Sequence, residues 1–556
     1  MSAQRSVVSS AKLIAICTLA SRFTGLARDI LLAQAFGLGW VQDAFSYAFQ
    51  FPNLFRRLFG EGAMAPVFVP TFTQTLEADG HPAAWQLLAR TLALLTLTLT
   101  ALIVLIMLVI AGIWFASSGT SEQLESRHLL LALTALMLPF MLTICVVALF
   151  SSILNCVGSF VPAALMPVLL NVGMIIGIVG LGPWWFPGDP RHQVHVVAAT
   201  VVITGVLQVF AILPVLRHQG VKLGWQLDWH DPVVKRMLRL LPPVALGQGV
   251  LTFGVFLDAQ VCTLLTHVAN TPDHVTFLGW AFRYPLEEGA LSAITYAQRL
   301  YQFPLGVLVI SLATAALPTF SRYVARQDWV AWTAEVRQTL RLAVFEGILA
   351  GTLIIVLAVP IVRFLFEYDN FTAAHTARAG RVLTFYGFGL WAFCAQHIVM
   401  RAFYSLHDVR TPLVISAVLL PLNLALSVAL IWVDGIREAA FAISTATTSS
   451  LAVIVGLVIL KRRVATRMMD RATFAALLKM LLAGVVTAGV LVLIQPACAS
   501  IAAKVPGVFM TRAAEVLGLL AIGGGVYLLI AWVLRLDEVG LLLTRRRGPR
   551  PAPPQP

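Results

Sequence analysis

The sequence predicts an all-α polytopic membrane protein with about fourteen transmembrane helices, built as two parallel six-helix lobes plus two C-terminal helices. Of the 556 residues, 59% are hydrophobic and only 12% are charged, whereas about a quarter of a typical soluble protein is charged. Apolar stretches of about twenty residues recur from end to end, and a helix of that length crosses a bilayer. Several sequence markers also recur at a nearly constant offset, which indicates two related halves.

Fourteen apolar stretches are the candidate spans, and we expect the first to stay in the protein. Arg5 and Lys12 precede it as in a signal peptide, but no Ala-x-Ala-like cleavage site follows. The spans lie near residues 10–36, 44–73, 92–115 and 129–154, then from 161 onward, and then near 194–217, 237–265, 291–320, 342–366, 382–404, 413–433, 439–460, 474–494 and 513–534.

The positive charges predict the orientation of the chain. The formal net charge of +13 would suit nucleic acid, but the Lys and Arg residues are spread over short loops instead of one face. The positive-inside rule explains them without a nucleic-acid partner. An even number of spans places the basic loops on one side, so we expect both termini to be cytoplasmic. These loops are 217–239, 322–341, 461–471 and 545–547.

Three markers form an internal repeat. The tetrapeptide FQFP at 49–52 returns as YQFP at 301–304, an offset of 252, and the triplet PTF at 70–72 returns at 318–320, an offset of 248. The third marker is a proline before an Asn-bearing helix, at an offset of 250: Pro162 with Asn171, and Pro412 with Asn423. Because each half has an even number of spans, the repeats should be parallel, with a binding site at their interface. The alternative is chance similarity among apolar helices.

The spans and the repeat together predict the domains. Residues 1–220 would form the N-terminal lobe, 221–463 the C-terminal lobe and 464–540 the additional helix pair. Residues 541–556, which are rich in Arg and Pro, would be a disordered cytoplasmic tail.

The first span carries charges that need an explanation. A charge at mid-bilayer depth costs roughly 2.5–3.5 kcal/mol, so it normally faces a cavity or a partner. Arg22 and Asp29 share a helix face, and Arg28 lies about 120° from Arg22. A bend at Gly25 would bring both arginines to one cavity. The alternative is that Arg28 or Asp29 marks the end of the helix at the membrane surface.

The second span adds Asp43 and two arginines with different expected roles. Arg57 stands four residues before Glu61, the spacing of an intrahelical ion pair, so this pair is predicted to be structural. Arg56 points about 100° away from Arg57 and is therefore assigned to the cavity. Asn53 lies one turn before both arginines and would orient either.

The eighth span carries Arg299 in the middle of its apolar run, with Tyr296 and Gln302 three residues away on either side. At the repeat offset Arg299 corresponds to Tyr47, so the second half does not copy the charges of the first. That asymmetry favours a functional role. Four arginines with few acids to neutralise them predict an anion site, because guanidinium groups bind phosphate bidentately.

No enzyme active site or cofactor is predicted. The six cysteines lie singly in apolar runs, without metal spacing, and are interpreted as core residues. His267, His274 and His407 lie in loops without a second ligand at metal spacing, and His397 is expected to be a core residue. There is no phosphate-binding Gly-rich loop and no nucleophile motif.

Three segments together resemble the MurJ (MviN) family of lipid II flippases, within the multidrug/oligosaccharidyl-lipid/polysaccharide exporter superfamily. They are SRFTGLARD (21–29), QDAFSYAFQFPNLFRRLFGEGA (42–63) and YAQRLYQFPLGVLVISLATAALPTFSR (296–322). The resemblance extends over essentially the whole chain, and it implies two lobes around a V-shaped cavity, with a lipid-facing groove on the last helix pair.

The resemblance also implies a function. Undecaprenyl-diphosphate-linked disaccharide-pentapeptide would pass from the inner to the outer leaflet of the bacterial cytoplasmic (inner) membrane, for peptidoglycan synthesis and cell shape. The implied cationic cavity is Arg22, Arg28, Arg56 and Arg299, with Asp29 and Asp43 as associated acids and Asn53 beside them. Expected partners are lipid II, membrane lipids and the cell-wall synthesis machinery. Membrane potential or an ion gradient would reset the cycle, at ~2.3 kcal/mol per charge per 100 mV.

Two departures from the family pattern concern ion coupling and one loop. Gln302 stands where some relatives have an acid, and the connection 267–290 is longer than usual for the family. Some relatives bind a cation in the second lobe. Asp258 and Asn423 could contribute here, but Ser427 stands where another acid would be needed, so that site stays open.

Three other functions compete with flipping. A multidrug or polysaccharide-lipid exporter of the same superfamily is the nearest, although a cationic-drug pump would favour acids and aromatic residues in its cavity. A membrane enzyme acting on polyprenyl diphosphates would need an acidic metal cluster, and none is visible in the sequence. A cell-wall scaffold would not explain arginines within the membrane.

Overall fold

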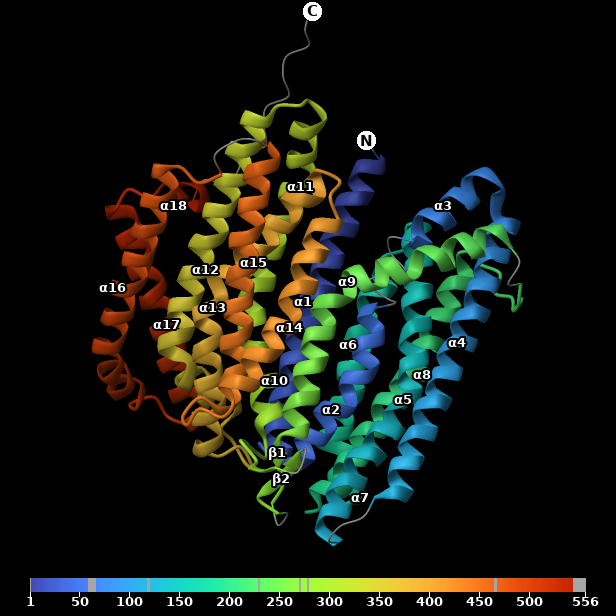
Figure 1. Cartoon of the computed structure of the whole chain (residues 1–556), viewed down its shortest axis with the longest axis horizontal. Helices are drawn as coiled ribbons and strands as arrows, with labels where there is room; N and C mark the ends of the chain where they lie inside the picture. Colours follow the sequence, from blue (N-terminus) through green and yellow to red (C-terminus); the bar gives the residue numbers. More distant parts are fainter. Residues whose placement is uncertain are drawn as a thin grey trace, which may run out of the picture. The chain divides into compact units, whose positions relative to one another are not determined.

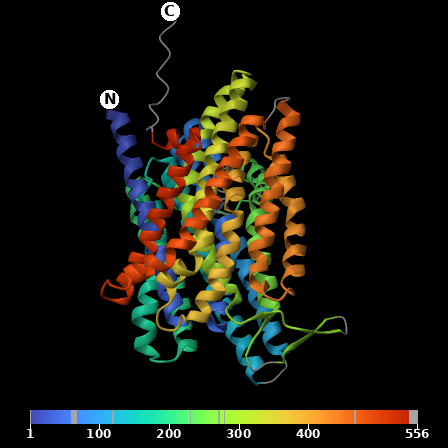
Figure 2. The same cartoon turned by 90° about the vertical axis from the view of Figure 1, so that its left-hand side faces the viewer.

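The computed structural model describes residues 2–58, 67–117, 121–228, 231–269, 272–277, 280–464 and 468–543. Long helices form two compact units (Figures 1 and 2). Unit 1 comprises residues 1–296, 366–375 and 428–438, and unit 2 comprises 297–365, 376–427 and 439–556. The expected tail lies almost wholly outside the described residues.

Unit 1 contains most of the helices of the N-terminal half. They are α1 (Ser2–Phe36), α2 (Trp40–Phe55), α3 (Val69–Ala78), α4 (Gly80–Ala116), α5 (Ser121–Cys156), α6 (Val161–Ile175), the π-helical η2 (Ile176–Leu181), α7 (Gly182–Trp185), α8 (Pro190–His218) and α9 (Pro232–Leu264).

Two small sheets interrupt this helical fold within the expected long connection. Their strands are β1 (Thr266–His267), β2 (His274–Phe277), β3 (Trp280–Arg283) and β4 (Leu286–Glu287). The β2–β3 pair is antiparallel with His274 opposite Arg283, and the β1–β4 pair is parallel with Thr266 opposite Leu286.

The helix α10 (Ala290–Pro304) begins in unit 1 and ends in unit 2. The remaining elements are η3 (Leu305–Val309, π-helical), α11 (Ile310–Ala325), α12 (Trp329–Phe366), α13 (Ala373–Ser405), α14 (Arg410–Leu430), the 3-10 turn η4 (Arg437–Ala439), α15 (Ala440–Val464), α16 (Arg471–Ala502), α17 (Val508–Val533) and α18 (Asp537–Leu543).

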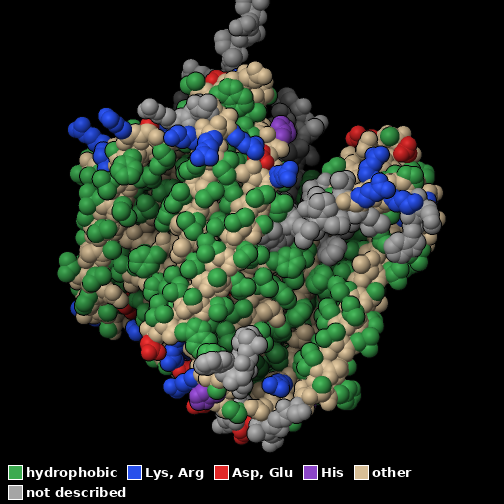
Figure 3. Space-filling view, in the orientation of Figure 1, with side chains coloured by type: hydrophobic (Ala, Val, Ile, Leu, Met, Phe, Trp, Pro, Cys, Tyr) green, Lys and Arg blue, Asp and Glu red, His purple; other side chains and the backbone are tan. Residues whose placement is uncertain are grey.

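Ten helices in the described part of the chain are long and apolar enough to cross a membrane. They cover the third to sixth and the ninth to fourteenth expected spans. The other four expected spans correspond to α1, α2–α3, α9 and α10–α11, so the count of fourteen remains a prediction. Hydrophobic side chains cover the sides of the helices, while Lys and Arg gather near the helix ends (Figure 3).

Aspartates set the beginnings of several helices. Asp189, Asp231 and Asp470 each accept hydrogen bonds from backbone N–H groups in the first turn of α8, α9 and α16. Proline is the first helical residue of α8 and α9, where its missing N–H costs nothing. Hydrogen bonds from Thr473 hold the pKa of Asp470 below its usual value. This cap is therefore present above the unfolded pKa and is lost as the pH falls through the lowered one.

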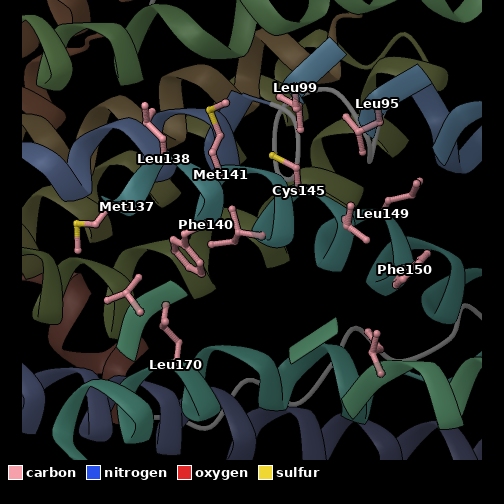
Figure 4. Close-up of a cluster of buried hydrophobic side chains, with 14 of the residues drawn as sticks. Leu95, Leu99, Met137, Leu138, Phe140, Met141, Cys145, Leu149, Phe150 and Leu170 are labelled. Carbon is pink, nitrogen blue, oxygen red and sulfur yellow. The ribbon is translucent and has the colours of Figure 1, made fainter. Parts of the chain in front are cut away.

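The core of unit 1 is built around α5, which packs against α2, α4 and α8. Its buried side chains include Met137, Phe140 and Leu149, which meet Leu95 of α4 and Leu170 of α6 in one cluster (Figure 4). Because this interior is apolar, every charged group inside unit 1 needs its own partner.

The repeated sequence markers coincide with repeated local structure. Pro52 lies inside α2 and Pro304 at the end of α10, and π-helical turns follow at 56–58 and in η3. A proline removes one helical hydrogen bond, which favours such a distortion. Each Gln-Phe-Pro segment is therefore followed by the same kind of helix distortion.

A second recurrence joins α6 to α8 and α14 to α15. Gly173 and Gly177, four residues apart on α6, pack against Thr204 and Thr200 of α8. On α14 the corresponding contacts lie four residues apart as well: Asn423 Nδ2 donates to Thr448 Oγ1 (3.3 Å), and the Ser427 and Ser444 hydroxyls are 2.6 Å apart. Small or polar residues thus bring both helix pairs close together.

The α6–α8 contact predicts a strong size limit at Gly173. A Cβ there would lie 2.0 Å from Thr204 Oγ1, whereas a Cβ at Gly180 would meet nothing within 4 Å. We expect Gly173→Ala to destabilise the protein by about 1–3 kcal/mol through overpacking. Gly180→Ala is the matched control and should be neutral or slightly stabilising. Thermal unfolding in detergent measures both, and equal melting temperatures would refute the close contact.

Candidate functional site

Arg28 is held in a buried polar network between α1 and α6. Its Nη2 and Nε donate to Asp29 Oδ1 (2.6 and 2.9 Å), and its Nη1 donates to Asn171 Oδ1 (2.9 Å). Arg28 and Asp29 are each 6% exposed. The α-helix continues for two turns beyond them, to Phe36. The carboxylate and the amide oxygen therefore compensate the guanidinium charge inside the helix bundle.

Gly25 gives α6 room to approach α1. The helix α1 is continuous through Gly25, and a Cβ there would lie 3.4 Å from Asn171 Nδ2. That amide nitrogen donates to Ser21 O and Thr24 Oγ1, both at 3.2 Å. Sequence reasoning used Asn171 only as a repeat marker. An asparagine within an otherwise apolar helix was the signal that it belongs to the site.

Arg22 lies on α1, less than two turns before Arg28, and is half-buried. It makes no hydrogen bond or ion pair with any of the residues that the structure describes. The five guanidinium N–H donors of Arg22 therefore have no acceptor among the described residues.

Asp43, on α2, caps the start of α10 and is 2% exposed. Its Oδ2 accepts from Gly289 N (2.7 Å), and its Oδ1 accepts from Ser292 N (2.8 Å) and Ser292 Oγ (2.5 Å). A carboxylate in this position satisfies unpaired N–H groups and stabilises the helix dipole. The role of Asp43 in this structure is thus to hold a helix end.

Glu288 caps α2 in return. Its Oε2 accepts from the backbone N–H of Trp40, the first residue of α2, at 3.3 Å. Gly289 has a φ of +83°, and a Cβ there would lie 2.6 Å from Leu38 Cβ. The start of α2 and the start of α10 are therefore held together by two carboxylates, beside the close contact of Gly289 with Leu38. We call the hydrogen bonds that Asp43 and Glu288 accept from these helix starts the reciprocal cap.

Arg56 lies in the π-helical turn that follows α2 and is half-buried. Its Nε donates to Asn53 Oδ1 over a long 3.5 Å, while Asn53 Nδ2 donates to Phe49 O at 3.0 Å. The helix backbone thus fixes Asn53, which in turn orients Arg56. Glu61, the expected partner of Arg57, lies outside the described residues.

Arg299 lies on the part of α10 that belongs to unit 2, and its side chain is exposed. Gln302 is half-buried. Tyr296 belongs to unit 1, where it is 2% exposed and packs on the rings of Phe366 and Phe371. Tyr296 is therefore a core residue, and it does not share the exposed environment of Arg299.

The three polar residues considered for a cation site belong to two different units. Asp258 lies on α9 in unit 1, whereas Asn423 and Ser427 lie on α14 in unit 2 and pair with hydroxyl groups of α15. Across the described ranges, no group of three or more His, Cys, Asp or Glu side chains could hold a metal ion.

Sequence comparison relates the chain to one family. The family model for "Lipid II flippase MurJ" matches residues 32–510. A "Probable lipid II flippase MurJ" of Rhizobium tropici is 29% identical over 541 residues, 96% of each chain. The "Lipid II flippase MurJ" of Burkholderia cenocepacia is 32% identical over 407 residues, 72% of this chain and 73% of the relative.

Two solved structures have the same fold. "Lipid II flippase MurJ, inward closed conformation" matches with a TM-score of 0.71 and 23% identity, over 94% of this chain and 99% of that one. An inward-facing multidrug resistance MATE family transporter of the MOP superfamily matches with a TM-score of 0.64 and 15% identity, over 81% and 98%. At these identities the likeness shows the fold alone.

The reciprocal cap predicts that Asp43 stabilises the protein. We expect Asp43→Ala to cost about 3 kcal/mol, because buried N–H donors lose a charged acceptor. Asp43→Asn keeps one acceptor oxygen and should cost less. Asp79 is exposed, so Asp79→Ala is the control. Chemical unfolding in micelles gives the order, and an Asp43→Ala variant as stable as the control would contradict the capping role.

Proposed function

This chain belongs to the lipid II flippase MurJ family, and we propose that it moves lipid II from the inner to the outer leaflet of the bacterial inner membrane. The family match over residues 32–510 carries the proposal. The outer leaflet would then supply the precursor for peptidoglycan synthesis, cell wall growth and cell shape. Flipping moves the molecule intact, so the protein acts as a transporter and not as an enzyme.

The diphosphate is the part of the substrate that the arginines would bind. We assign this role to Arg22, Arg28, Arg56 and Arg299, because guanidinium groups pair bidentately with phosphate oxygens. Arg22 is half-buried and makes no contact with a described acid, which supports its availability. Arg28 uses four of its five N–H donors within the protein, because its Nη1 also donates to Met174 Sδ at 3.9 Å, so one donor remains for an anion.

The acids and Asn53 would act by positioning. Asp29 holds the guanidinium of Arg28, and Asn53 orients Arg56. Asp43 fastens α2 to α10, the helices that lead to Arg56 and Arg299. Substituting any of these three residues would therefore impair transport even if the residue does not touch the substrate.

Transport would proceed by alternating access between two lobes. We propose lobes at 1–220 and 221–463, related by an axis along the membrane normal, with both termini cytoplasmic. Arg28 is 6% exposed in this conformation, so it would reach the diphosphate only after the helices move. Membrane potential or an ion gradient would reset the cycle.

The polyprenyl tail would remain in lipid beside the helix pair 464–540. Apolar side chains are highly exposed there, including Leu493 at 80% and Trp532 at 67%. Such a surface suits an acyl or isoprenoid chain that never leaves the bilayer. Only the polar headgroup would then need a path through the protein.

The second candidate is a multidrug or polysaccharide-lipid exporter, which the MATE-like fold supports. A pump for cationic drugs would need acids that face its cavity. In the described structure Asp29 and Asp43 are instead committed to Arg28 and to α10. The balance of charge therefore favours an anionic substrate.

A charge series tests the arginine site. We expect Arg→Ala at positions 22, 28, 56 and 299 to abolish growth of a strain that depends on this copy. Arg→Lys should restore it partly, because ammonium keeps the charge and loses the bidentate geometry. Membrane levels of each variant are measured by immunoblot in the same cells.

Arg127 is exposed near the start of α5, so Arg127→Ala is the matched control and should support full growth. Full complementation by all four alanine variants at normal protein levels would refute the arginine site. Resistance to cationic drugs without any growth defect would instead favour the exporter.

A further inference from the structure

Glu346 is a buried acid on α12 that the proposed transport site does not use. It is 8% exposed, and no hydrogen bond or ion pair joins it to any residue that the structure describes. Its Oε2 is fully enclosed. A carboxylate buried without a counter-charge is strongly disfavoured, and an ionisable group within a membrane helix is by default a functional candidate.

Three neighbouring helices, α13, α16 and α17, pack against the part of α12 that carries Glu346. A Cβ at Gly347 would lie 2.8 Å from Trp391 Cα and 3.1 Å from Cys394 Sγ, so α12 and α13 are in close contact at this level. Phe345 is fully buried against Tyr527 of α17, whose hydroxyl donates to Phe345 O at 3.3 Å. On α16, which packs against Ile348 and Thr352, the charged residue Lys479 donates to Leu534 O at 2.9 Å. The titratable groups of α13 and α17 nearest to this level are Cys394 and Tyr527. Neither is a cation that could neutralise a carboxylate.

The register of α12 and α13 follows from their contacts. The two helices are antiparallel neighbours, visible side by side in Figure 1. Gly351 packs on Gly387, and Trp332 Nε1 donates to Ser405 Oγ at 3.1 Å. Moving one turn along α12 from Gly351 toward Trp332 therefore corresponds to moving one turn along α13 from Gly387 toward Ser405.

This register places polar groups at successive levels. Thr339 lies two turns before Glu346 on the same face of α12, is 1% exposed, and has no hydrogen-bond partner for its hydroxyl among the described residues. On α13, Cys394, His397 and Arg401 share one face at intervals of three and four residues. By this register Thr339 is level with Val399 and Glu346 with Ala392, so Arg401 and Cys394 each lie two residues further along α13.

These side chains follow one another along α12 and α13 from Glu346 toward the Trp329 end of α12, which is cytoplasmic in the topology proposed above, and we call them the polar file. His397 and Arg401 are half-buried, and the Arg401 guanidinium lies 5.9 Å from the centre of the Tyr404 ring. An imidazole can accept a proton on one nitrogen and release one from the other, which is the chemistry of a relay. A proton could therefore move along the polar file, whereas the surrounding apolar side chains cannot bind one.

We propose that Glu346 is a proton-binding site of unit 2, loaded and unloaded along this polar file. The step is the addition of one proton to the carboxylate to give the neutral carboxylic acid, with no other bond made or broken. If the burial of such a site differs between two conformations, its proton affinity differs as well, and binding a proton then shifts the equilibrium between the conformations. The proposal concerns the protein alone and holds whatever substrate the chain carries.

Infrared spectroscopy of the full-length protein in lipid nanodiscs tests the site without transport. We expect a carboxylic acid C=O band that disappears as the pH rises and is lost in Glu346→Gln. Glu346→Asp keeps a carboxyl group and should shift the band instead of removing it, which guards against misfolding of the Gln variant. The exposed acid Glu77 provides the control, because Glu77→Gln should leave the band unchanged.

Transfer into D2O tests the route. The band should move to its deuterated position more slowly in His397→Phe than in the wild type, while the same substitution at His128, which lies on α5 in unit 1, should not slow it. The proton site is refuted if the wild-type and Glu346→Gln spectra are identical at every pH, or if the band never titrates. Equal exchange rates in His397→Phe and the wild type would refute the relay.

Discussion

The reciprocal cap between α2 and α10 is the interaction on which the arrangement of the charged residues depends. Asp43 binds the first turn of α10, and Glu288 binds the first amide of α2. The two N-termini would otherwise leave unpaired N–H donors buried beside each other, with helix dipoles that repel. The two carboxylates accept hydrogen bonds from these N–H donors, and their negative charges offset the positive ends of the helix dipoles. The starts of α2 and α10, both in unit 1, are therefore fixed to each other.

Charge balance separates structural from functional groups in this protein. Arg28 has Asp29 and Asn171, and Asp43 has the amides of α10, so these charges are compensated where they lie. Within the described residues, Arg22 and Glu346 are different, because neither has a hydrogen-bonded or ionic partner. An uncompensated group in a membrane protein is costly and calls for a ligand. An anion would satisfy Arg22, and a proton would satisfy Glu346.

Much of the fold could be predicted from the sequence because its main signals are local. Ten of the expected spans appear as long apolar helices, and a π-helical turn follows each of the two Gln-Phe-Pro markers. The partners of the charged residues could not be predicted. Asn171 is 143 residues from Arg28, and Ser292 is 249 residues from Asp43. Helical periodicity tells which face a side chain occupies, but not which helix that face meets.

The most direct test of the account is the leaflet in which lipid II collects when this protein is removed. Cells that depend on this copy are depleted of it, and an enzyme that cannot cross the membrane is added outside to cleave exposed lipid II. The account predicts that lipid II accumulates and becomes protected from cleavage, because it stays in the inner leaflet. An unchanged cleaved fraction after depletion would contradict the account, since another route would then carry lipid II across.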